Sequence, residues 1–134
     1  MIAFDTNVLI YSCDRTDPAR QAKAIELIDS AVDGVILWQV ALEFIAASRK
    51  LSAQGFTPED AWNRLAEFLG LFPLATPSSG VLARARALHS AQGFAFWDAM
   101  IVGHCLERGI SRLYSEDLPG RAPVQGVEII NPFA

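Results

Sequence analysis

The chain alternates short apolar runs with longer segments of helical periodicity. The apolar runs fall at Ile2–Phe4, Val35–Trp38, Leu71–Ala75, Leu113–Ser115 and Val127–Ile130. A strand with one face in water alternates apolar and polar residues, whereas a strand covered on both faces is apolar throughout. Strands of the second kind that alternate with helices are typical of a parallel sheet between helix layers. We therefore predict an α/β fold, a three-layer α/β/α arrangement with about five parallel strands at its centre.

Capping residues and glycines delimit the helices between these runs. Asp17-Pro18 is typical of an N-cap followed by proline at the first helical position, and Thr57 to Asp60 is close to a capping box. Pro73 restricts the third apolar run to an edge strand, because proline cannot donate to a neighbouring strand. We expect helices over Val8–Tyr11, from Pro18 until Gly34 stops the helix, over Gln39–Ala53, from Pro58 onward, from Ser78 or Ser79 to Gln92, and over Trp97–Glu107.

The composition suits one domain over residues 1–134. Hydrophobic residues make up 51% of the chain, and we find neither a repeat nor a linker. Cys13 and Cys105 are too few for a disulfide framework and predict free thiols. The N-terminus lacks the features of a signal peptide, and the longest uncharged stretch is too short and too interrupted to span a bilayer. We expect a cytoplasmic protein without a membrane contact.

Several common site motifs are missing from the sequence. It contains no Gly-x-Gly-x-x-Gly, no Gly-x-x-x-x-Gly-Lys-Ser/Thr and no Gly-x-Ser-x-Gly. His89 and His104 lack the spacing of a zinc motif. The net charge of −4 also argues against a broad basic surface for nucleic acid.

Four carboxylates fall where an apolar sheet protein rarely places them. Asp5 directly follows one predicted strand, and Asp117, with Glu116, follows the strand that ends at Ser115. Glu43 and Asp98 lie beside or within helix stripes that should be buried. Each has a structural interpretation when taken alone. Asp5 and Asp98 would cap helices, Glu43 would reach water from the edge of the core, and Asp117 would stabilise a turn.

Taken together, the four acids predict a bound cation. A buried carboxylate without a partner costs several kcal/mol. Positively charged partners are scarce, since no Lys or Arg precedes Arg15 and none lies within nine residues of Asp98. Carboxylate oxygens suit Mg²⁺ or Mn²⁺, and such ions at the end of a sheet suit phosphoryl chemistry.

Four blocks of the sequence, in order, resemble the PIN-domain ribonucleases. They are Asp5-Thr6-Asn7, Gln39–Phe44, Phe96–Ala99 and Leu113–Leu118, with a familiar C-terminal segment at Val127–Phe133. The resemblance covers nearly the whole chain and implies a PIN-like fold similar to the VapC-type toxins of bacterial toxin–antitoxin pairs. The sequence departs from the pattern at Leu42, where related branches often have Asn, and in the proline-rich segment Leu118–Pro123.

The resemblance also implies roles for individual residues. Asp5, Glu43, Asp98 and Asp117 match the family's four acids, which would hold Mg²⁺, or Mn²⁺ in its place, with one or two ions per site. Thr6, Asn7, Ser115 and Glu116 would support those acids through hydrogen bonds. Arg49 and Lys50, beyond Glu43 on the same helix, would either contact RNA phosphates or form a solvated helix end.

The expected function is that of a metal-dependent endoribonuclease. A metal-activated water would attack an RNA phosphodiester. The resemblance further implies a cognate antitoxin and a homodimer. Trp62, Phe68, Phe72 and Phe94 would form part of an interface or fill the core.

Two alternatives stay open at this point. The first is a degenerate PIN-like binding module without catalysis. The second is a receiver-like phospho-acceptor domain, which needs a lysine after a late strand, whereas Lys23 and Lys50 both lie in early helices.

The charge balance takes on a new meaning with these four acids. Without them, the remaining Asp and Glu equal the 11 Lys and Arg in number. The net charge of −4 can then be assigned to the predicted site, and two divalent ions would neutralise it.

Overall fold

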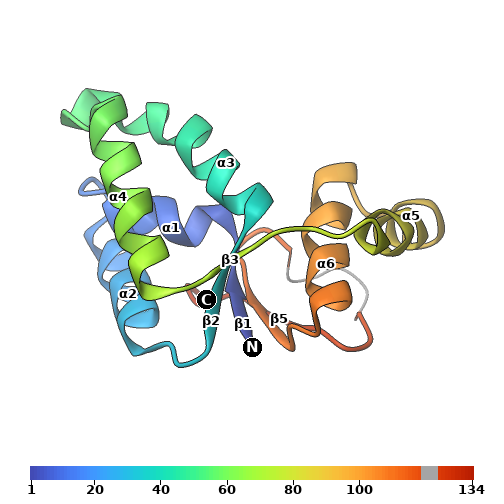
Figure 1. The fold of residues 1–134 in the computed structure, drawn as a ribbon. Coiled ribbons are helices and arrows are strands. Elements are labelled where there is room, and N and C mark those ends of the chain that lie inside the picture. The colour runs from blue at the N-terminus through green and yellow to red at the C-terminus, as the bar shows by residue number, and fades with distance from the viewer. Residues whose placement is uncertain (119–123) are drawn as a thin grey trace.

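Five parallel strands form one sheet in the order β3-β2-β1-β4-β5 (Figure 1). The computed structural model describes residues 1–118 and 124–134, so most of the proline-rich segment lies outside the described residues. In the register of the sheet, Ala3 of β1 pairs with Val35 of β2 and with Leu113 of β4. The strands are β1 (Ile2–Phe4), β2 (Gly34–Leu37), β3 (Leu74–Ala75), β4 (Arg112–Tyr114) and β5 (Glu128–Ile130).

Helices cover both faces of this sheet (Figure 1). On one side lie α1 (Thr6–Cys13), α2 (Pro18–Ser30), α3 (Trp38–Ala47), the 3-10 helix η1 (Ser48–Gln54) and α4 (Pro58–Leu71). On the other side lie α5 (Gly80–Gln92) and α6 (Phe96–Arg108). The predicted α/β/α fold with five parallel strands is therefore confirmed, and β3 is an edge strand as Pro73 indicated. In the described part of the chain, no helix combines the length and the apolar character that crossing a bilayer requires.

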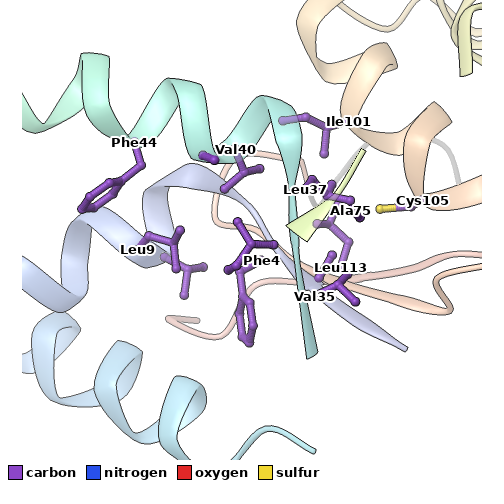
Figure 2. Packing of buried hydrophobic residues seen from close by; sticks show 14 of the residues in the cluster. Phe4, Leu9, Val35, Leu37, Val40, Phe44, Ala75, Ile101, Cys105 and Leu113 are labelled. Carbon is purple, nitrogen blue, oxygen red and sulfur yellow. The ribbon is translucent and has the colours of Figure 1, made fainter. Parts of the chain in front are cut away.

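The buried side chains form a core on each face of the sheet. Figure 2 shows Phe4 of β1 together with Leu9 of α1 and Val40 and Phe44 of α3. On the other side of the sheet, Ile101 and Cys105 of α6 lie near Leu37 and Ala75 (Figure 2). Because both faces are covered, the central strands carry apolar residues at successive positions, which explains the continuous runs in the sequence. Phe68, Phe72 and Phe94 fill this core, whereas Trp62 is exposed.

Several predicted helix boundaries are confirmed. The side chain of Asp17 accepts a hydrogen bond from the N–H of Arg20, with Pro18 as the first helical residue. Thr57 and Asp60 form a capping box, in which each side chain accepts from the other's backbone N–H.

Several boundaries differ from the sequence prediction: α1 spans Thr6–Cys13 and not only Val8–Tyr11, and Leu71 ends α4 instead of opening a strand. Trp38 begins α3 instead of ending β2, because the strand passes into the helix without a turn residue. The α-helical part of α3 ends at Ala47, where the hydroxyl of Ser48 donates to the carbonyl of Ile45 and the chain tightens into η1. Gly34 does not stop α2, which ends at Ser30. Gly34 begins β2, where a Cβ atom would come within 2.7 Å of the Phe72 ring.

Gly103 marks the closest approach of α6 to α5. A Cβ atom at this position would lie 2.9 Å from the backbone nitrogen of Ala85. We expect Gly103→Ala to lower the free energy of unfolding by about 1–3 kcal/mol, because neither helix backbone can yield easily. Gly70 on α4 is the matched control, since a Cβ atom there would meet nothing within 4 Å. Gly70→Ala should raise stability by about 0.5–1 kcal/mol. Urea unfolding measures both variants, and an unchanged Gly103→Ala protein would contradict this packing.

Candidate active site

The order of the strands creates a reversal between β1 and β4. The chain proceeds from β1 to β2 and β3 on one side, and then returns to place β4 on the other side of β1. In parallel sheets, ligands bind beyond the carboxyl ends of the strands at such a point. Asp5 follows β1 here, and Ser115, Glu116 and Asp117 follow β4.

A pocket of about 560 Å³ opens at this point, and all four predicted acids line it. Asp5 and Asp117 come from the ends of β1 and β4, Glu43 from α3 and Asp98 from α6. Three of the four predicted supporting residues, Thr6, Asn7 and Glu116, line the pocket as well. A smaller pocket of about 290 Å³ beside α1 and α4 contains none of the four acids.

Asp5 is the most buried of the four acids, with 7% of its surface exposed. One carboxylate oxygen accepts from the N–H of Thr6 at 2.7 Å, so Asp5 caps α1 as its structural interpretation predicted. The other oxygen accepts from the hydroxyl of Ser115 at 2.7 Å. Burial raises the pKa of Asp5 to about 6, although these two hydrogen bonds lower it, and the charges of Glu43 and Asp117 raise it further. Burial and the neighbouring negative charges therefore disfavour the ionised form of Asp5.

Glu43 lies half-buried on α3 and is held by two side chains. One oxygen accepts from the hydroxyl of Thr6 at 2.8 Å, and the other accepts from the amide of Gln39 at 2.6 Å. Gln39 also donates to the backbone carbonyl of Trp97 at 3.1 Å, which links α3 to the start of α6. Glu43 thus faces the pocket, in addition to bordering the apolar stripe of its helix.

The turn after β4 is organised around the buried hydroxyl of Ser115. Besides donating to Asp5, this hydroxyl accepts from the N–H groups of Asp117 and Leu118, both at 3.3 Å. The carboxylate of Asp117 accepts from the amide of Asn7 at 3.0 Å. Asp117 is therefore both a turn residue and a wall of the pocket.

Asp98 lies in the first turn of α6, three residues after the N-cap position. The N-cap position is Ala95, which makes no side-chain hydrogen bond, so the N-cap interpretation of Asp98 is wrong. A carboxylate in the first helical turn is favoured by the helix dipole. The side chain is half-buried and lines the pocket, while Ile101 one turn later also lines it.

Glu116, which is not one of the four predicted acids, is held by an ion pair and a hydrogen bond. Its carboxylate accepts from the hydroxyl of Tyr11 at 2.6 Å and pairs with Arg20 at 2.9 Å. The hydrogen bond to Glu116 raises the pKa of Tyr11 to about 12. Through these contacts, Glu116 anchors its turn against α1 and α2, and the same turn carries Asp117.

The two predicted RNA-contacting cations separate in the structure. Lys50 lines the pocket. Arg49 is not among the lining residues, and its guanidinium donates to the backbone carbonyl of Phe56 at 3.0 Å. Of the two residues, only Lys50 therefore lies at the pocket.

Sequence reasoning missed further residues of the pocket. Asp14 and Trp97 line it, Tyr11 both lines it and binds Glu116, and Gln39 holds Glu43. The spacing of Gln39 and Glu43 by four residues on one helix was a signal for their hydrogen bond. No comparable local signal existed for Trp97, because an exposed Trp beside a charge has no periodic signature.

The donor chemistry of the pocket fits Mg²⁺ or Mn²⁺. Its acidic walls offer oxygen atoms, and neither His nor Cys lines it among the described residues. The raised pKa of Asp5 reflects burial and neighbouring carboxylates, a repulsion that a divalent cation would relieve. Within the part of the chain that the structure describes, however, no three His, Cys, Asp or Glu side chains already stand together as ligands of one ion.

Comparisons with known proteins agree with this geometry. The sequence matches the family model of the PIN domain over residues 2–118. No curated protein matches it. The fold is similar to a chain of a toxin–antitoxin complex from Klebsiella pneumoniae, with a TM-score of 0.71, 19% identity and 98% of each chain covered. It is also similar to a chain of VapBC2 from Rickettsia felis, bound to a DNA fragment from its promoter, with a TM-score of 0.69, 15% identity and 98% of each chain covered.

Proposed function

This chain belongs to the PIN-domain family, and from that membership we propose that it is an endoribonuclease dependent on Mg²⁺ or Mn²⁺. PIN domains are generally nucleases. The observation that carries the proposal is the convergence of Asp5, Glu43, Asp98 and Asp117 on one pocket at the carboxyl ends of β1 and β4. The family match also removes the receiver-like alternative.

In this proposal, the four acids hold one or two divalent ions. Such an ion would lower the pKa of a water molecule and neutralise phosphate charge. The carboxylates of Asp5 and Glu43 have both oxygens in hydrogen bonds, yet a carboxylate oxygen has more than one lone pair, so each can still coordinate. Thr6, Asn7 and Ser115 hold the carboxylates in place, and Lys50 contributes a positive charge on the wall of the pocket.

The biological setting that we propose is a toxin–antitoxin pair. The two similar structures come from such complexes, which supports a VapC-type toxin with a cognate antitoxin. We further propose a homodimer of single-domain chains that acts on RNA in the cytoplasm.

The test is RNA cleavage by the purified protein in Mg²⁺, in Mn²⁺ and in excess chelator. We expect cleavage with either metal and none with the chelator. Thermal unfolding with and without Mg²⁺ separates a nuclease from a degenerate module, because an ion that binds only the folded state raises the melting temperature. Cleavage that survives chelation, or a melting temperature that does not change with Mg²⁺, would contradict the proposal.

Ser115 offers a test of how the acids are positioned. We expect Ser115→Ala to lower the cleavage rate by about 10-fold to 100-fold, because the groups that orient metal ligands have effects of this size. Ser115→Thr keeps the hydroxyl and should retain most of the rate. Initial rates at saturating Mg²⁺ measure both variants, after circular dichroism has shown that they fold. Equal rates for Ser115→Ala and wild type would remove Ser115 from the site.

A further inference from the structure

Trp97 is exposed at the rim of the acidic pocket, where the proposed function gives it no role. It exposes 64% of its surface and lines the pocket next to Asp98. Trp62 exposes a similar 60% of its surface on α4 but is not among the residues that line this pocket. The two side chains differ mainly in location, which makes Trp62 a natural reference.

Neighbouring groups hold Trp97 in place. Its backbone carbonyl accepts from the amide of Gln39, which also donates to Glu43. The indole meets the ring of Phe96 edge to face, with ring centres 4.9 Å apart and planes at 78°. Phe96 in turn meets the ring of His89 at 5.9 Å. The exposed indole is thus anchored to the same network that positions an acid of the site.

Because most charged side chains of the pocket are negative, a contact with RNA that does not depend on charge is favoured there. Among the described residues that line it, Lys50 is the only Lys or Arg, against six Asp and Glu side chains. Without a bound metal ion, this surface offers little electrostatic attraction to the phosphate groups of RNA. Stacking of a base on an aromatic ring does not depend on phosphate charge and contributes about 1–3 kcal/mol per base.

We propose that Trp97 stacks on an unpaired base next to the phosphate that is cleaved. This inference rests on the proposed function. A base in a regular duplex is already stacked on its neighbours, whereas unpaired bases can turn out onto aromatic side chains. Trp97 is therefore a substrate-binding residue that selects RNA structure, and the acids remain the centre of the chemistry.

The experiment measures binding of a fluorescein-labelled, mixed-sequence RNA of about ten nucleotides, a length within the range that single-strand sites cover. All proteins carry Asp98→Asn to prevent turnover. In this background we compare Trp97→Ala, Trp97→Phe, Trp97→Leu and Trp62→Ala by fluorescence anisotropy. The same strand annealed to its complement provides the duplex arm. Sedimentation velocity records the mass of each protein.

The expected result is a loss of single-strand affinity of about 5-fold to 100-fold for Trp97→Ala. Trp97→Leu should show the same loss, whereas Trp97→Phe and Trp62→Ala should bind as the parent protein does. Duplex binding should not change in any variant. This pattern would show that an aromatic face at position 97 is needed, and that apolar surface alone is insufficient.

Other results would overturn the inference. They are unchanged single-strand binding in Trp97→Ala, equal losses in Trp97→Ala and Trp62→Ala, or full binding by Trp97→Leu. A lower mass for Trp97→Ala would instead make this rim an interface between copies of the chain. The binding comparison does not require turnover, so it can fail independently of the proposed function. The proposed function itself fails if the protein with Asp98 intact does not cleave RNA in Mg²⁺.

Discussion

Asp98→Asn should lower the rate of RNA cleavage by more than about 100-fold, since even groups one step removed from a metal cost about 10-fold to 100-fold when changed. Asp98, on α6, lines the same pocket as Asp5 and Asp117. The substitution keeps the size of the side chain and removes one negative charge from the proposed metal site. The initial rate of cleavage at saturating Mg²⁺ is the quantity to measure.

Asp29 provides the matched control for this substitution. It is an exposed aspartate on α2 that does not line the pocket, so Asp29→Asn makes the same chemical change elsewhere. We expect Asp29→Asn to cleave RNA at the wild-type rate. Equal rates for Asp98→Asn and Asp29→Asn, in proteins that unfold at the same urea concentration, would exclude Asp98 from the chemistry.

Asp5→Asn should make the metal-free protein more stable at pH 8 while it removes the response to Mg²⁺. The pKa of Asp5 is raised to about 6, from an ordinary value of 3.8, chiefly by burial. The folded protein thus holds this proton more tightly than the unfolded chain does. Stability is lost as the pH rises from about 4 through about 6, by an amount of order 3 kcal/mol. Asn has no such ionisation, and its single amide oxygen can still accept from the N–H of Thr6 as an N-cap, although its NH2 group cannot accept from the hydroxyl of Ser115.

Urea unfolding in chelator at pH 4 and at pH 8 tests this prediction. We expect Asp5→Asn to exceed wild type by about 1–3 kcal/mol at pH 8, with the difference shrinking toward pH 4. Added Mg²⁺ should stabilise wild type and Asp29→Asn but leave Asp5→Asn unchanged. A variant that is less stable than wild type at pH 8 in chelator would contradict the predicted cost of ionising Asp5 in the folded protein.

The sheet and its helix layers could be predicted because a strand that is buried on both faces is apolar at successive positions, which is visible in the local sequence. The apolar runs at β1 and β2 and the capping residues Asp17 and Thr57 are local signals of this kind. The boundary at Trp38 could not be predicted, because an apolar aromatic residue suits both the end of a buried strand and the start of a buried helix.

The site was predictable where topology alone brings residues together. Asp5 and Asp117 follow strands that turned out to be neighbours, so the same edge of the sheet collects them. The partners of those acids depend on packing between distant segments. Thr6 binds Glu43, and Arg20 pairs with Glu116, across 37 and 96 residues of sequence. Nothing in the local pattern around Arg20 indicates that contact.

The most direct test of the central claim is the origin of the oxygen in the cleaved phosphate. Wild-type protein would cut RNA in Mg²⁺, in water enriched in the heavy oxygen isotope, and mass spectrometry would weigh the fragment ends. Hydrolysis by water predicts a terminal phosphate that carries one heavy oxygen, with no product in chelator. A cyclic phosphate without the heavy isotope, formed equally well in chelator, would mean that the RNA's own hydroxyl attacks and that the acidic pocket does not carry the reaction.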